Sequence, residues 1–169
     1  IVLGSLHNLR SQQDFYYMDY SAPTDAQIAD LFDRALTEMT ELLDFDGIHV
    51  LTHLTYMHRY VRRAGRDVDF TPFLDKLSAL LKKLIQKEVA LEVNTAAISP
   101  AKGGVLSPTA EIVALYRSLG GRLISVGSDA HNLAAVAQHF DIAKQVLTDC
   151  GFTELAVPTR NGLLTLPIS

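Results

Sequence analysis

The sequence has little of what several classes of protein require. It contains no tryptophan and a single cysteine, Cys150, among its 169 residues. An internal disulfide framework is therefore excluded, and a reducing compartment such as the cytoplasm is favoured. No apolar run approaches the roughly 18 residues of a membrane helix, and the start of the chain shows no signal-peptide pattern. We therefore expect a cytoplasmic protein that does not enter a membrane.

An excess of positive charge is also missing. There are 15 lysines and arginines against 19 aspartates and glutamates, which gives a formal net charge of −4. The basic residues form no long stripe, so we expect no nucleic-acid partner. The hydrophobic content of 48% is ordinary for a globular protein with a real core. Since the composition does not change along the chain, residues 1–169 are expected to form one domain without an internal boundary.

Strand and helix patterns alternate four times. Each expected strand is a short apolar segment, and each following helix shows apolar residues at i, i+3, i+4 and i+7. The first helix starts with a capping box, in which Thr24 is followed three residues later by Gln27. The expected strands are 1–7, 48–53, 89–94 and 122–128, and the expected helices are 24–44, 71–85, 107–119 and 132–150. This order predicts an α/β fold with parallel strands joined by right-handed crossovers.

The length decides between two forms of that fold. A complete (β/α)₈ barrel typically needs about 250 residues, and this chain has 169. Four βα units are either an open sheet or the later part of a barrel. The chain opens directly in an apolar segment, Ile1–Gly4, without an initiator methionine. We therefore expect the later part of a barrel whose N-terminal strands are absent.

Histidine and aspartate stand where three of the expected strands end. His7 and His53 close the first two strands, and Asp129 and His131 follow the fourth. If the chain is still extended there, Asp129 and His131 leave the same face of the strand. Imidazole and carboxylate groups suit zinc, manganese or iron better than calcium or magnesium. The alternative is that Asp129 caps a helix and that the histidines are structural or exposed.

Several other polar residues have positions that suggest a role. The loop 8–24 is rich in tyrosine and aspartate and could cover a site. His49 lies deeper in the second strand than His53 and is expected to be structural. His58 and His139 are expected on helix surfaces.

Four motifs resemble those of the polymerase and histidinol phosphatase (PHP) family, in particular its histidinol-phosphatase branch. Their order and spacing match over nearly the whole chain, with Arg59-Tyr60 after the second motif and Gly151-Phe152 near the end. The motifs are Gly4-Ser5-Leu6-His7, Leu51-Thr52-His53-Leu54, Leu91-Glu92-Val93-Asn94-Thr95 and Gly127-Ser128-Asp129-Ala130-His131.

The resemblance implies a distorted (β/α)₇ barrel related to the TIM barrel. It also implies a di- or trinuclear cluster of divalent metal ions such as zinc, manganese or iron at the strand ends. Such a cluster hydrolyses small phosphomonoesters, for example L-histidinol phosphate in histidine biosynthesis, by means of a metal-bound hydroxide. His7, His53, Asp129 and His131 match metal-ligand positions, and Asp129 and His131 are also our candidate catalytic residues.

The resemblance covers only part of the family's metal site. The other ligands come from an earlier His-x-His motif, a further histidine and an acidic residue on preceding strands. No His-x-His is present in the 169 residues. We therefore expect this chain to lack part of the cluster.

A phosphate group needs cationic partners close to the metals. Arg160 is the first candidate, since the resemblance suggests a phosphate-contacting arginine in the tail. Arg59 and Lys102 lie on loops at strand ends and are further candidates. Asn94 and Glu92 are expected to line the pocket, or to orient the metal ligands without binding the metal themselves.

Three other readings stay open at this level. The chain could be a catalytically inactive structural fragment that dimerises, or that pairs with its missing N-terminal part through an open strand edge. It could be a phosphatase of the same family with another substrate, such as phosphotyrosine, or a nuclease accessory domain. It could also be a complete open α/β binding domain with incidental histidines.

Overall fold

A four-stranded parallel sheet forms the centre of the computed structural model, which describes residues 1–168. The strands lie in their sequence order, and each pairs in parallel with the next. They are β1 (Leu3–Gly4), β2 (Val50–Leu51), β3 (Ala90–Asn94) and β4 (Ile124–Gly127). The predicted parallel α/β fold is confirmed, although β1 and β2 are shorter than predicted.

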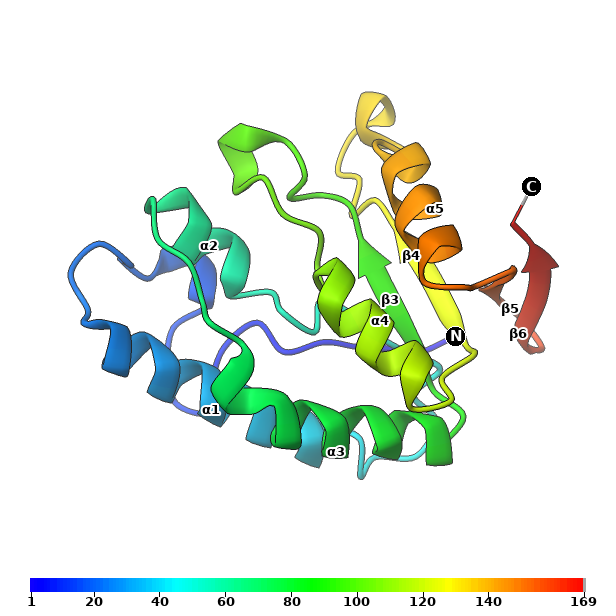
Figure 1. The fold of residues 1–169 in the computed structure, drawn as a ribbon, viewed down its shortest axis with the longest axis horizontal. Coiled ribbons are helices and arrows are strands. Elements are labelled where there is room, and N and C mark those ends of the chain that lie inside the picture. Colours follow the sequence, from blue (N-terminus) through cyan, green and yellow to red (C-terminus); the bar gives the residue numbers. More distant parts are fainter. Residues whose placement is uncertain (169) are drawn as a thin grey trace.

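Four of the helices connect or follow these strands. Figure 1 shows α1, α3 and α4 in succession along one side of the sheet. The capping box at Thr24 is present, with Gln27 and Thr24 bonding each other's backbone N–H. These helices are α1 (Asp25–Leu42), α3 (Leu74–Gln86), α4 (Ala110–Ser118) and α5 (Phe140–Asp149).

Two helical segments differ from the prediction. A short helix, α2 (His58–Arg63), follows β2 where the sequence shows too few residues to display a helical period. Helix α5 begins well after residue 132, because Ala137 and His139 adopt φ values of 58° each. A left-handed residue interrupts a right-handed helix, so the helical spacing before Phe140 reflects only a turn, η4 (Leu133–Ala135).

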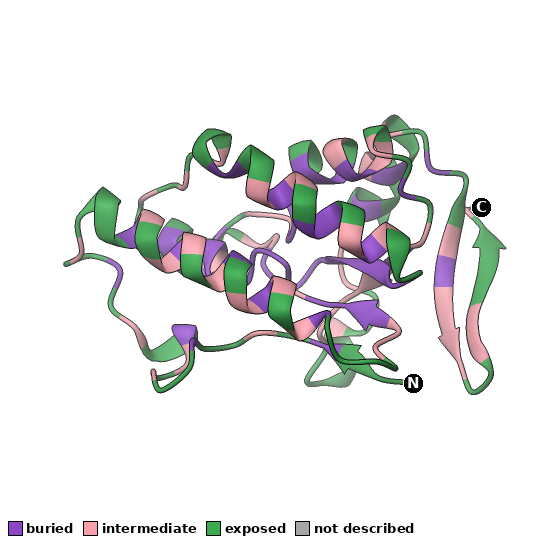
Figure 2. Ribbon diagram, turned by 90° about the horizontal axis from the view of Figure 1, so that it is seen from below, coloured by how far each residue is buried: buried purple, intermediate pink, exposed green. Residues whose placement is uncertain are grey.

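The tail forms an antiparallel hairpin outside the parallel sheet. It consists of β5 (Glu154–Thr159) and β6 (Gly162–Pro167), and β5 packs beside β4. Figure 2 shows that β6 is almost entirely exposed, whereas the inner faces of the helices are buried. The sequence also predicts two short β segments in the tail, 154–157 and 163–166, and the hairpin confirms both.

One core joins the helices to the sheet. Leu36, Leu80 and Leu84 from α1 and α3 are almost completely buried against strand residues such as Leu91. Burial of each such side chain stabilises the fold by roughly 1.5–3 kcal/mol. Because the carboxyl ends of all four strands lie on one side of this core, loops from four strands meet at one edge.

The sheet has an open edge at β1 within residues 1–168. Its sequential order, with each crossover leading to the next neighbour, is the arrangement of consecutive strands in a βα barrel. The described residues do not close such a barrel, so the barrel stays a prediction.

Candidate metal and phosphate site

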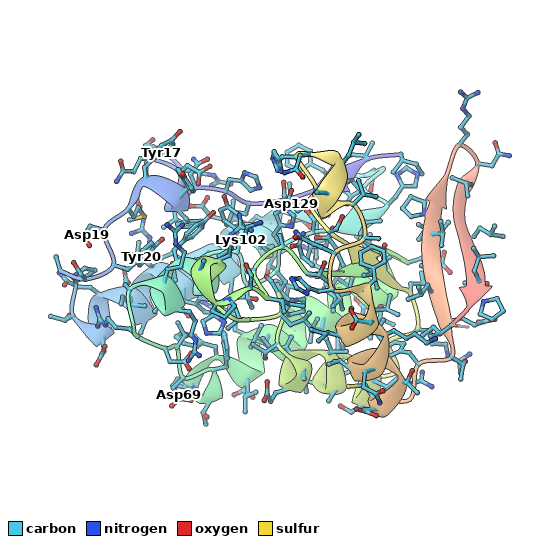
Figure 3. The ribbon with its side chains drawn as sticks, turned by 90° about the horizontal axis from the view of Figure 1, so that it is seen from above. Tyr17, Asp19, Tyr20, Asp69, Lys102 and Asp129 are labelled. Atoms are coloured by element: carbon cyan, nitrogen blue, oxygen red, sulfur yellow. The ribbon has the colours of Figure 1, made fainter. Side chains whose placement is uncertain are left out.

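A cavity of about 390 Å³ lies where the loops after the four parallel strands meet. Lys102 and Asp129, both labelled in Figure 3, line this cavity. Five of the residues predicted to act at the site line the cavity, together with four aromatic or basic residues and an alanine. The lining residues are His7, Tyr16, Tyr56, Arg59, Tyr60, Arg63, Ala96, Lys102, Asp129 and His131.

His7, which lines the cavity, stacks on His53, which is not among the lining residues. The ring centroids of His7 and His53 are 5.5 Å apart with an angle of 12° between the planes. The Tyr56 ring stacks on His7 at 4.5 Å. Partial burial, followed by the neighbouring His53, lowers the pKa of His7 below the usual 6.5. His7 is therefore neutral at pH 7, the state in which imidazole binds a metal.

In each of the three histidines predicted as metal ligands, Nδ1 is directed at an oxygen atom. Nδ1 of His53 lies 2.8 Å from a Glu92 carboxylate oxygen, and Nδ1 of His131 lies 2.8 Å from the carbonyl oxygen of Asp129. Nδ1 of His7 is 3.7 Å from a carboxylate oxygen of Asp14. Within residues 1–168 no hydrogen bond engages the Nε2 atoms of these rings. His53 and His131 thus show the arrangement typical of metal-binding histidines, in which the second nitrogen is held by an acceptor, whereas the His7–Asp14 distance is too long for a hydrogen bond.

Two predicted ligands have strained backbones. His53 has a φ of 55° and Asp129 a φ of 48°, in the left-handed region that non-glycine residues rarely adopt. Such strain of about 1–3 kcal/mol is often found at functional sites. The premise that Asp129 and His131 share one face of an extended strand is wrong. Strand β4 ends at Gly127, and the turn at Asp129 folds His131 back onto its carbonyl group.

The donors fit a metal in kind but do not converge on one point. The imidazoles and the carboxylate of Asp129 are ligands that zinc, manganese and iron accept. Within residues 1–168, however, no three histidine, cysteine or acidic side chains are close enough together to hold an ion. The cavity therefore carries potential ligands around its wall without a complete set.

Arg59 is fixed at the cavity by aromatic rings. Its guanidinium carbon lies 4.2 Å from the centroid of Tyr56 and 4.9 Å from that of Tyr60. Nη2 donates to the Tyr60 hydroxyl at 2.8 Å, and Nη1 lies 3.7 Å from a carboxylate oxygen of Asp129. The Arg59 side chain is only 16% exposed, and its buried Nε finds no partner among the described residues. This leaves a preorganised cation beside the predicted ligand Asp129.

Lys102 reaches the same cavity from another strand-end loop. It ends the turn η3 (Pro100–Lys102), which packs against α2. The next residue, Gly103, has a φ of 122°, and a Cβ there would lie 2.6 Å from the carbonyl oxygen of Arg59. Only glycine permits both this conformation and this approach. The loop is thereby held so that Lys102 and Arg59 line one cavity.

The sequence did not predict which aromatic residues line the cavity. Tyr16 comes from the turn η1 (Phe15–Tyr17), and its ring meets the edge of the Tyr60 ring at 5.8 Å. The sequence indicated that the loop 8–24 could cover a site, and Tyr16 does line the cavity. Tyr60 and Arg63 lie on α2, whose existence the sequence did not reveal.

Some predicted residues lie elsewhere. Arg160 is exposed in the turn between β5 and β6 and does not line the cavity. Asn94 is buried and bonds to Glu92 and to the backbone of Ala96.

The expected surface position of His58 is wrong, because this residue is 3% exposed and bonds to Asp67. His49 accepts a hydrogen bond from the backbone N–H of Val2, as expected of a structural residue.

The known proteins that this chain resembles in sequence are named histidinol-phosphatases. A probable histidinol-phosphatase of Thermotoga maritima is 34% identical over 139 residues, which cover 82% of this chain and 55% of the relative. The histidinol-phosphatase of Lactococcus lactis is 27% identical over 113 residues, covering 67% of this chain and 41% of the relative. The chain is similar to histidinol phosphatases. No family model matches it.

The fold is shared with solved structures of such proteins. The crystal structure of histidinol phosphate phosphatase from L. lactis, a complex with zinc, L-histidinol and phosphate, superposes with a TM-score of 0.71. It is 20% identical, and the match covers 96% of this chain and 61% of that one. A putative histidinol phosphatase from Listeria monocytogenes gives a TM-score of 0.65 at 21% identity, covering 83% of this chain and 56% of that one. This chain thus spans about half the length of the relatives it matches.

Proposed function

We propose that this chain is part of a metal-dependent phosphoesterase of the histidinol-phosphatase type, which hydrolyses a small phosphomonoester such as L-histidinol phosphate. The observation that carries the proposal is the composition of one cavity. His7, Asp129 and His131 line it together with Arg59 and Lys102. Potential metal ligands and phosphate-binding cations thus face the same space. The similarity to histidinol phosphatases independently favours the same chemistry.

The metal ions would be held by His7, His53, Asp129 and His131. We propose a di- or trinuclear cluster of zinc, manganese or iron, for which the described residues supply only part of the ligands. Bound metal lowers the pKa of a water molecule toward 7 and so provides hydroxide for attack on phosphorus. The zinc in the related L. lactis structure supports this choice of metal.

The chain's own cations would bind and orient the phosphate. Arg59 cannot swing away easily, since two tyrosine rings and the Tyr60 hydroxyl hold it. Its planar fork is suited to grip two phosphate oxygens, and Lys102 adds a second positive charge from the neighbouring turn η3. Both groups would also stabilise the charge that develops on the phosphoryl oxygens. Arg160 stays a prediction as a substrate contact, and the geometry favours Arg59 and Lys102.

The architecture belongs to the same proposal. We take residues 1–169 as one partial barrel domain in which β1 to β4 are the later strands of a (β/α)₇ barrel. The sequential parallel order and the open edge at β1 favour this assignment. The single cysteine favours the cytoplasm, and no helix within residues 1–168 is long and apolar enough to cross a membrane.

Zinc binding tests the metal site directly. Titration calorimetry on the 169-residue chain should show zinc binding that falls at least tenfold in affinity in the His7→Ala, His131→Ala double variant. His139→Ala is the matched control, since His139 lies outside the cavity. Hydrolysis of L-histidinol phosphate and p-nitrophenyl phosphate is then measured with zinc and with manganese. Unchanged zinc affinity in the double variant would contradict the proposal.

Phosphate binding tests the role of Arg59. Removing a fixed guanidinium that bonds an anion costs roughly 1.5–3 kcal/mol, which corresponds to a 10- to 150-fold weaker Kd for inorganic phosphate in Arg59→Ala. Arg34→Ala removes an exposed arginine that pairs with Asp30 on α1, and it should leave the Kd unchanged. Equal Kd values in all three proteins would assign the phosphate site elsewhere.

A non-catalytic role is the second candidate, because the described residues do not complete a metal site. It predicts that the zinc-loaded chain hydrolyses neither substrate. Hydrolysis of either substrate by the zinc-loaded chain would reject it.

A further inference from the structure

We infer that Glu92 is a positioning residue that fixes the imidazole of His53 for metal binding, and that Gly127 leaves the space its carboxylate needs. This rests on the proposed function, because it assigns His53 as a ligand. The sequence predicted that Glu92 would line the pocket or orient the ligands, without indicating which ligand. The structure shows which groups it holds.

One carboxylate oxygen of Glu92 holds His53 at two points. It accepts the backbone N–H of His53 at 3.2 Å and faces Nδ1 of the ring at 2.8 Å. The side chains are 13% exposed for His53 and 11% for Glu92, so water competes little for these bonds. The backbone bond also supports the left-handed φ of 55° at His53. Glu92 therefore fixes both the main chain and the ring of this residue.

The carboxylate of Glu92 decides which nitrogen of the His53 ring carries the proton. The side-chain oxygen of Asn94 accepts the backbone N–H of Ala96 at 3.0 Å, so the Asn94 nitrogen is left to donate. That nitrogen lies 3.3 Å from the same Glu92 oxygen and also 3.3 Å from Nδ1 of His53. The Glu92 oxygen, at 2.8 Å, is the closer partner of Nδ1, and since a carboxylate oxygen accepts, Nδ1 of His53 donates to it. The lone pair of the ring is then on Nε2, the atom available to a metal.

Gly127 provides the space for this arrangement. A Cβ built on Gly127 would lie 2.1 Å from the second carboxylate oxygen of Glu92, which is far inside contact distance. Gly127 is in strand β4 and has no positive φ, so its backbone does not call for glycine. The β3–β4 register places Gly127 opposite Asn94. The presence of glycine before Ser128-Asp129 is therefore explained by the Glu92 carboxylate on the neighbouring strand β3.

The first test reads the proton position without any metal. In metal-free protein, two-dimensional ¹⁵N NMR of the His53 ring should show the Nδ1–H tautomer. Glu92→Met keeps a similar side-chain size but removes the acceptor, so the Nε2–H form that free histidine prefers should become dominant. Glu92→Gln retains an acceptor and should restore much of the Nδ1–H form. An unchanged tautomer in Glu92→Met would overturn the inference.

The second test measures zinc affinity by competition with a chelator. Loss of the group that orients a ligand typically weakens metal binding 10- to 100-fold, which is expected for Glu92→Met and Gly127→Ala, with Glu92→Gln in between. Glu88→Gln is the matched control, because Glu88 is exposed in the turn after α3. Gly127→Ala keeps the inference falsifiable if Glu92→Met does not fold. Full zinc affinity in the folded variants would overturn it.

The two tests separate this inference from the proposed function. If zinc affinity is insensitive to His7→Ala, His131→Ala, the metal site itself is refuted, whatever the tautomer of His53. If that variant loses zinc while Glu92→Met and Gly127→Ala retain it, only the role of Glu92 is refuted.

Discussion

At the residue scale, His58 shows how burial changes the pKa of a side chain. His58 on α2 is 3% exposed, with its ring edge-on to Phe70 at 5.1 Å. Its Nε2 bonds to Asp67 at 2.7 Å, while its buried Nδ1 has no partner among the described residues. Burial lowers the pKa of His58 below 6.5, and this outweighs the opposite effect of the Asp67 hydrogen bond. His58 is therefore held neutral in the folded protein.

Stability should fall in mild acid because of this residue. Since the unfolded chain binds a proton near pH 6.5 and the folded chain only at lower pH, the stabilisation is complete above pH 6.5. It decreases as the pH falls below that value, by at most about 1.4 kcal/mol per pH unit for one proton. Chemical unfolding between pH 7.5 and 5.5 should show a shallower decrease in His58→Gln than in the unaltered protein.

The charged groups around His58 are Asp67, Arg62 and, from α4, Glu111, and all three stay in this variant. His139→Gln, at the start of α5, is the control and should keep the original slope. Parallel pH curves for His58→Gln and the unaltered protein would show that His58 is not responsible.

At the level of elements, helix α2 and the turn η3 together build the cationic side of the cavity. Helix α2 carries Arg59, and η3 carries Lys102. Their contact depends on Gly103, which lies against the Arg59 backbone. The two cations are therefore positioned by one backbone approach and not by a direct side-chain contact.

Gly103→Ala should separate the two elements. The added methyl group meets the Arg59 carbonyl oxygen at 2.6 Å, and φ is 122°. Gly120→Ala is a matched control, because Gly120 also has a positive φ of 94° but nothing within 4 Å of an added Cβ. Both variants carry backbone strain, and the clash should cost Gly103→Ala roughly 1–3 kcal/mol more free energy of unfolding.

Urea denaturation measures this difference, and calorimetry with inorganic phosphate measures its effect on the site. Weaker phosphate binding is expected only in Gly103→Ala. Equal stability of the two variants would mean that the loop moves aside without cost.

At the scale of the whole molecule, the edge of the parallel sheet at β1 has no partner strand within the described residues. Strand β1 pairs on one side with β2, and Ile1, Val2 and Leu3 are each more than 50% exposed. An exposed apolar strand edge is a template for pairing with another strand. The alternative left open by the sequence, self-association or pairing with further strands of a barrel, would use this edge.

Sedimentation velocity should therefore detect association that increases with concentration. Leu3→Lys places a charge on the edge and should shift the population toward monomer, since charged residues block strand pairing. Leu133→Lys is the control, because Leu133 is 92% exposed in η4, away from β1. Monomer alone at all concentrations for the unaltered chain would contradict the prediction.

The sequence by itself determined the order of elements and the types of residue at the strand ends. Hydrophobic periodicity fixed the four βα units, because apolar spacing of 2 or 3.6 residues has few alternatives over long segments. The placement of His7 and Asp129 after separate strands then implied that they meet, since parallel strands end on one side. Periodicity could not reveal α2, which is too short, or the delayed start of α5, which depends on φ values of single residues.

Only the tertiary structure decided which polar groups touch. The bond from Glu92 to His53 joins residues 39 positions apart, and no local pattern encodes it. Arg59 rather than Arg160 faces the cavity because two tyrosine rings and a glycine contact hold it there. Hydrogen bonds and ring contacts act over a few ångströms in space, and spacing along the chain constrains such distances only within one helix or strand.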